Sequence, residues 1–158
     1  MADLCIPKDD GVTHVNIYSK SKSELGLLLS NFTYFPFDHP NFGHFDSMEG
    51  FWYWLATGKK HNELRAVYGV KAKKLGKTFP RIDNPDFQSE FISGLEIKAG
   101  DAKIKKLLAE TYIPIVHYYY FGDVDNCRVV IPTGSDWFTE WWERKRLALN
   151  GDWTCYYF

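Results

Sequence analysis

Hydrophobic residues are most frequent in the sequence between residues 44 and 58, where the chain reads HFDSMEGFWYWLATG. Four of them recur at the i, i+3, i+4, i+7 spacing of one helix face: Met48, Phe51, Trp52 and Leu55. The two aromatic residues between Trp52 and Leu55 lie off that face, so the helix is apolar almost all round. The pattern predicts a buried helix over residues 47–57, capped by Asp46 or Ser47 and ended by Gly58.

One carboxylate, Glu49, lies at the start of this aromatic helix. Asp46 and Glu49 have the spacing of a capping box, in which the acidic side chain reaches back to the N-cap amide. The alternative is a chemical role, because the positive end of the helix dipole favours an ionised carboxylate. Both interpretations stay open, and one side chain can serve both.

Weaker patterns predict the remaining elements. Further helices are expected over residues 62–77, 86–99, 102–112 and 137–149. Short strands are expected over 15–18, 114–121 and 128–131, the last two as a hairpin, with 153–158 as a possible edge strand. Residues 26–37 suggest an irregular aromatic loop or a short strand, lining either the core or a ligand. His117, in a predicted strand, is interpreted as a packed histidine.

Strands near both ends of the chain with helices between them predict an α+β fold. We expect a single compact, mainly helical domain over residues 1–158, with 1–13 as a loose N-terminal segment.

Lysines gather in the second half of the predicted 62–77 helix: Lys71, Lys73, Lys74 and Lys77. Cations at a helix C-terminus complement its dipole, so a solvated face is the simpler interpretation. The functional alternative is a cationic lip for a phosphate, made by Lys77 together with Arg81.

Composition narrows the class of protein. With 45% hydrophobic and 18% aromatic residues the chain is globular, and a formal net charge of −1 argues against general nucleic-acid or membrane-surface binding. The three cysteines are far apart, and no His, Cys or Asp cluster has ligand spacing, so we expect no disulfide framework, metal or cofactor.

The N-terminus lacks an apolar signal and the longest apolar run, residues 112–121, is too short to span a membrane, so a cytoplasmic location is expected.

Two motifs resemble the NADAR family, the YbiA-like proteins. The first is LLSNF, which supplies Ser30, Asn31 and Phe32, and the second is FDSMEGFWYW, which supplies Ser47 and Glu49. The resemblance covers about residues 15–55, and AKKLGK at 72–77 is similar to the family's next helix. It implies a compact, mainly helical α+β fold with a central pocket.

The resemblance also implies chemistry on an N-glycosidic bond between ribose and a base, in ADP-ribose conjugates or ribosyl nucleotides. It implies that Glu49 stabilises the oxocarbenium-like state and orients water, and that Asn31 binds ribose hydroxyls. Expected substrate-binding residues are Ser30, Phe32, Trp52, Lys77, Arg81, Asp136 and Trp137.

Two features depart from the family pattern. The lysine that usually follows the glutamate by seven residues is Ala56 here, with Lys59 or Lys60 a turn further on. The late glycine-rich motif is replaced by SDWFTEWWERKRLAL. We therefore expect an N-glycoside hydrolase acting on a small-molecule nucleotide or an ADP-ribosylated base. A non-catalytic binder of such nucleotides is the alternative, and a protein-binding domain using Trp141, Trp142 and residues 156–158 is a third.

Overall fold

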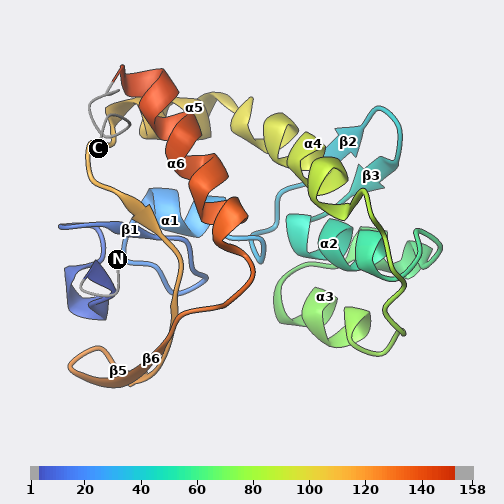
Figure 1. Ribbon diagram of the computed structural model, residues 1–158, viewed down its shortest axis with the longest axis horizontal. Coiled ribbons are helices and arrows are strands. Elements are labelled where there is room, and N and C mark those ends of the chain that lie inside the picture. The colour runs from blue at the N-terminus through green and yellow to red at the C-terminus, as the bar shows by residue number, and fades with distance from the viewer. Residues whose placement is uncertain (1–3, 152–158) are drawn as a thin grey trace. The chain divides into compact units, whose positions relative to one another are not determined.

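The computed structural model describes residues 4–151 and has an α+β fold, which confirms the predicted fold class (Figure 1). The chain forms two compact units. The terminal unit comprises the chain up to Ser30 together with the chain from Ala102 onward, and the central unit comprises Asn31–Asp101. The single domain expected over residues 1–158 stays a prediction, and each unit is described by itself.

The terminal unit joins the two ends of the sequence through a short parallel pair. Strand β1 (Val15–Asn16) pairs with β4 (Ile115–Val116), with Val15 opposite Ile115. Around this pair lie α1 (Glu24–Leu29), α5 (Ala102–Glu110) and α6 (Asp136–Asn150), and α5 packs against both α1 and α6. A late hairpin forms as predicted, from β5 (Tyr119–Asp123) and β6 (Asn126–Val130), which pair antiparallel. The single strand expected over residues 114–121 is wrong, because Ile115–Val116 pairs with β1 instead and the hairpin strand begins only at Tyr119.

Two further expectations for the terminal unit need correction. Part of the segment expected as an irregular loop is helix α1, because Ser23 Oγ accepts a hydrogen bond from the Gly26 amide at 3.0 Å and Leu25 and Leu29 are buried on one face. The N-terminal segment is also less loose than expected, since it contains the 3-10 turn η2 (Pro7–Asp9) and the buried Asp10.

The aromatic surface expected near the C-terminus is not formed by Trp142, which is 0% exposed. The possible strand at 153–158 lies outside the described residues. His117 is packed as predicted, with its Nδ1–H donating to the Ile17 carbonyl at 2.6 Å.

The central unit is built around α2 (Met48–Ala56). This helix packs against α3 (Gly69–Gly76), α4 (Phe87–Ala99) and the 3-10 helix η3 (Asn62–Ala66) (Figure 1). A short hairpin, β2 (Phe37–His39) with β3 (Gly43–Phe45), precedes it. The core side chains with 0% exposure are Phe45, Met48, Phe51, Leu55, Leu64, Ala72, Phe91 and Leu95. The predicted buried helix is therefore the centre of this unit's core.

The single helix predicted over 62–77 is wrong, because it divides into η3 and α3. Gly69 has a positive φ of 59°, which glycine adopts readily and which reorients the chain between the two pieces. The division turns α3 so that its buried residues, Ala72 and Gly76, face the unit's core.

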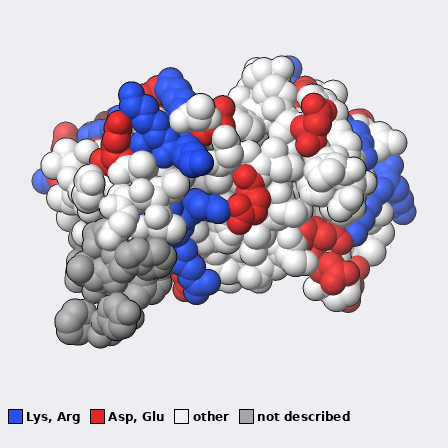
Figure 2. Space-filling model, turned by 90° about the horizontal axis from the view of Figure 1, so that it is seen from above, with Lys and Arg blue, Asp and Glu red and all other residues white. Residues whose placement is uncertain are grey.

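Within the described residues, no helix combines the length and apolar character needed to cross a membrane. On the face shown in Figure 2, basic and acidic side chains lie in small groups beside one another. This mixed distribution agrees with the net charge of −1.

Candidate functional site

The first turn of α2 uses Ser47, and not Glu49, to satisfy its backbone. Ser47 is the N-cap: its Oγ accepts from the Gly50 amide at 3.0 Å and donates to the Val67 carbonyl at 2.8 Å. Asp46 instead bonds through Oδ1 to His44 Nε2 at 2.9 Å. The capping box considered for Asp46 and Glu49 is therefore wrong, and within residues 4–151 no hydrogen bond is found for the Glu49 carboxylate.

Asn31 is fixed beside Glu49 through the backbone, since the Glu49 amide donates to the Asn31 carbonyl at 2.9 Å. The side-chain Oδ1 of Asn31 is buried and has no hydrogen-bond partner in the part of the chain that the structure describes. A buried acceptor without a donor is costly, and such groups are found where a ligand or water completes the bonding. The two residues predicted to act together are thus adjacent.

Positive charges of α3 lie close enough to influence the Glu49 carboxylate. Burial raises the pKa of Glu49 from its ordinary 4.5 to about 7, while the charges of Lys73 and Lys77 act in the opposite direction. Lys73 Nζ also lies 5.8 Å from the centroid of the Phe32 ring. Phe32 and Lys77, both predicted site residues, therefore lie in the surroundings of Glu49 together with Lys73.

Tyr53 is the second side chain of α2 in this cluster. It follows Glu49 by one helical turn and is 7% exposed. Its pKa is raised, mainly by burial and further by the negative charge of Glu49, and the positive charge of Arg81 opposes the change. Arg81 is thereby placed near the same face of α2. We call Asn31, Phe32, Glu49, Tyr53, Lys73, Lys77 and Arg81 the Glu49 cluster.

The close approach of α2 and α3 that forms the cluster depends on Gly76. A Cβ atom at this position would lie 2.0 Å from Tyr53 Cγ, well inside van der Waals contact. The glycine lets the Tyr53 ring lie directly on the backbone of α3 and so keeps the lysines of that helix near Glu49.

Four other predicted site residues have surroundings of their own. Trp52 packs edge-to-face on Phe87 and Phe91 of α4, with ring centroids 4.6 and 5.0 Å away. Ser30 is the C-cap of α1 and is buried, while Asp136 and Trp137 begin α6. These three residues belong to the terminal unit.

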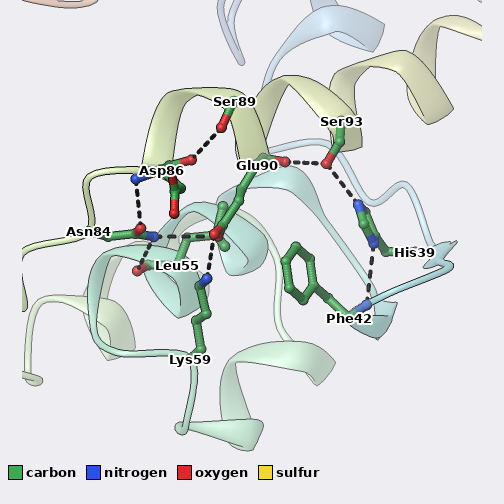
Figure 3. Close-up of polar contacts among 9 residues, drawn as sticks. All are labelled: His39, Phe42, Leu55, Lys59, Asn84, Asp86, Ser89, Glu90 and Ser93. Atoms are coloured by element: carbon green, nitrogen blue, oxygen red, sulfur yellow. Dashed lines mark hydrogen bonds and ion pairs between the residues drawn. The ribbon is translucent and has the colours of Figure 1, made fainter.

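Lys59, one of the two lysines a turn beyond Ala56, forms an ion pair with α4. Its ammonium group pairs with Glu90 of α4 and lies 5.2 Å from the Phe42 ring centroid (Figure 3). Asn84 Nδ2 also donates to Glu90 Oε2, at 3.4 Å. The ion pair joins the end of α2 to α4, whereas the positive charges that act on Glu49 are those of Lys73 and Lys77.

A serine and a histidine in contact, Ser93 and His39, could act as a nucleophile and its general base, but the protonation of the His39 ring excludes this (Figure 3). His39 Nδ1 accepts from the amides of Asn41 and Phe42, at 3.1 and 3.3 Å. Its Nε2 must then carry the proton and donate to Ser93 Oγ, 2.8 Å away, so it cannot remove a proton from that hydroxyl. The contact ties the β2–β3 hairpin to α4.

No group of three or more His, Cys, Asp and Glu residues within the described chain is arranged to hold a metal ion. The Glu49 cluster contains a single carboxylate and no histidine, which is a poor ligand set for a divalent cation.

Sequence reasoning missed Lys73 and Tyr53 as members of the cluster. Each lies one helical turn from a predicted site residue. Tyr53 is four residues after Glu49, and Lys73 is four residues before Lys77. This i, i+4 spacing places both side chains on the helix face of a predicted site residue and could have identified them from the sequence.

Comparison of the chain with protein-family models, curated proteins and solved structures gives no match.

Proposed function

We propose that the protein is a hydrolase that cleaves the N-glycosidic bond of an ADP-ribose-type or ribosyl-nucleotide substrate at the Glu49 cluster. The observation that carries this proposal is Glu49 itself: a partly buried carboxylate, without a capping role, among lysines and an unsatisfied amide. The N-cap bond of α2 is made by Ser47, so the Glu49 carboxylate is not consumed by capping.

The proposed reaction requires charge stabilisation at the ribose. The C1′–N bond breaks with its electron pair leaving on the base nitrogen, and positive charge develops on C1′ and the ring oxygen. The Glu49 carboxylate stabilises that charge and accepts a proton from the attacking water, whose oxygen bonds to C1′. The proton is then delivered to the departing base.

The remaining members of the cluster support the same reaction. The unpaired Asn31 Oδ1 can accept a hydrogen bond from a ribose hydroxyl. Lys73, Lys77 and Arg81 can pair with substrate phosphates, which a neutral ribose alone would not require. A pKa of about 7 for Glu49 leaves a substantial carboxylate fraction at neutral pH, and the group can both take and return a proton there.

A non-catalytic binder of the same nucleotides is the second candidate. It is favoured by Ala56, which stands where the NADAR pattern has a lysine, and by the engagement of Lys59 with Glu90. The two candidates share the ligand and differ in turnover.

The test is incubation of wild type and Glu49→Gln with ADP-ribose, NAD and ADP-ribosylated guanosine, with cleavage followed by mass spectrometry. Gln keeps the size and most hydrogen bonding but not the charge. Losing one such electrostatic contact costs about 3–4 kcal/mol in the barrier, so we expect the rate to fall roughly 10²–10³-fold with little change in ligand affinity.

Glu63→Gln is the matched control, because Glu63 is exposed on η3 of the same unit. Wild-type turnover that Glu49→Gln leaves intact would remove Glu49 from the mechanism. Ligand binding without turnover in wild type, weakened by Asn31→Ala, would favour the binder.

A further inference from the structure

Two tyrosines of the central unit form an exposed aromatic pair. Tyr34 is 56% exposed and Tyr68 is 50% exposed. Their ring centroids are 5.2 Å apart at an interplanar angle of 60°, an edge-to-face contact. Each ring is therefore held in position by the other while much of its surface stays exposed to solvent. A flat apolar group can stack on such an exposed ring.

Hydrogen bonds tie the segments that bear these tyrosines to the first turn of α2. Tyr34 lies between Asn31, whose carbonyl accepts from the Glu49 amide, and Phe35, whose amide donates to the Asp46 carbonyl at 2.9 Å. Tyr68 directly follows Val67, whose carbonyl accepts from Ser47 Oγ. The pair is thus anchored on two sides to the turn that contains Glu49.

The same segments adjoin the cationic side of the Glu49 cluster. A Cβ atom at Gly69 would lie 3.6 Å from the Phe32 carbonyl oxygen, so residues 32–34 pass beside the start of α3. Further along that helix, Lys73 Nζ lies over the Phe32 ring. An aromatic surface, a carboxylate and positive charge therefore adjoin one another within the central unit, as a base, a ribose and a phosphate do in a nucleotide.

We propose that Tyr34 and Tyr68 bind the planar base of the nucleotide by stacking, and that this pair makes the protein prefer nucleotides to sugar phosphates without a base. The proposal rests on the proposed function at Glu49. Trp52, an aromatic residue of α2 expected to bind substrate, packs on Phe87 and Phe91. Stacking needs only a π-face, so this site favours a heteroaromatic base over a base-free sugar phosphate.

The test is isothermal titration of wild type, Tyr34→Ala, Tyr68→Ala and Tyr68→Phe with adenosine 5′-monophosphate and guanosine 5′-monophosphate. Ribose 5-phosphate serves as the probe without a base. Each alanine variant should bind the nucleotides roughly 10- to 100-fold more weakly, the loss typical of one stacked base, and bind ribose 5-phosphate as wild type does. Tyr68→Phe should retain nucleotide affinity, because the ring is preserved.

Tyr112→Ala is the matched control, since Tyr112 is 69% exposed and belongs to the terminal unit. Melting temperatures of all variants should match that of wild type, because both rings of the pair are largely in solvent. Alanine variants that bind both nucleotides like wild type would overturn the tyrosine proposal and leave the proposed function standing. If wild type cleaves substrate yet binds nucleotides no better than ribose 5-phosphate, the tyrosine proposal is again overturned and the proposed function stands. If wild type neither binds nor cleaves, both proposals are overturned.

Discussion

Ser47 and Glu49 are two residues apart at the start of α2, yet their side chains have opposite environments. The Ser47 hydroxyl both accepts from Gly50 and donates to Val67. No described group donates a hydrogen bond to the Glu49 carboxylate, and it is held beside positive charge that lowers the cost of ionising it. A carboxylate in this state stabilises a cation better than one already saturated with hydrogen bonds.

This environment predicts a pH-dependent cost to folding. The folded-state pKa of Glu49, about 7, lies above its ordinary 4.5, so folding favours the protonated form. Stability from this group is fully present below pH 4.5, falls as the pH rises, and is lost once the pH passes about 7. Relative to wild type, Glu49→Gln should therefore gain on the order of 2–3 kcal/mol of unfolding free energy between pH 4.5 and pH 8.

Urea unfolding at several pH values between 4.5 and 8 measures this difference. Glu63→Gln, at an exposed position of the same unit, should follow wild type across the range. A constant offset between Glu49→Gln and wild type would contradict the raised pKa of Glu49.

Among the elements, the pairing of α2 with α3 determines the geometry of the candidate site. Gly76→Ala should disrupt it, because the new methyl group would lie 2.0 Å from Tyr53 Cγ and one helix must move away. Overpacking of this kind costs about 1–3 kcal/mol, which outweighs the gain in helix propensity of up to about 1 kcal/mol. We expect a lower melting temperature and, as Lys73 and Lys77 move away from Glu49, weaker nucleotide binding.

Lys74→Ala is the control for this variant, since Lys74 is exposed on the same helix. It should leave both the melting temperature and nucleotide affinity close to wild type. A Gly76→Ala protein as stable as wild type would mean that α2 and α3 are not in the close contact described.

The hydrophobic pattern predicted elements well where one helix face was dense in apolar residues, as in α2 and α4. It failed where a local feature decided the outcome. Helix α1 depends on the Ser23 cap within a short segment, and the separation of η3 from α3 depends on the positive φ of Gly69. Periodicity over a long window does not detect either feature.

The candidate site was predictable only in part. Asn31, Phe32 and Glu49 came from motifs, and the structure brings them together through the bond between Asn31 and Glu49. Tyr34 and Tyr68 could not have been paired in advance, because they lie on segments whose contact depends on how η3 and α3 meet α2. Contacts of this kind are tertiary and leave no periodic signal in the sequence.

At the scale of the whole molecule, the two ends of the chain are joined by buried polar bonds within the terminal unit. The Asn16 side chain accepts from the Tyr118 amide at 3.0 Å and donates to the Tyr118 carbonyl at 3.1 Å, across 102 positions in sequence. Such long-range closure costs loop entropy, so the bonds that fix the N-terminal segment must be well satisfied.

Asp10 fixes that segment, and its removal should destabilise the protein. The Asp10 carboxylate is 4% exposed and accepts three hydrogen bonds of 2.9 Å, from the Asn16 amide, Ser21 Oγ and the Lys22 amide. Asp10→Ala leaves these donors without an acceptor, and each buried unpaired group costs about 1–3 kcal/mol. Because Lys22 is exposed and water can reach its amide, we expect a loss of about 2–4 kcal/mol in unfolding free energy, measured in urea at pH 7.

Asp9→Ala separates this effect from a general loss of negative charge. Asp9 is the preceding residue, it is less buried than Asp10, and no hydrogen bond of its carboxylate is found within residues 4–151. Its removal should cost less than about 1 kcal/mol, as surface changes usually do. Equal losses for the two variants would show that charge, and not the three buried hydrogen bonds, stabilises the N-terminal segment. An Asp10→Ala protein as stable as wild type would show that the junction of β1 and β4 holds without the carboxylate.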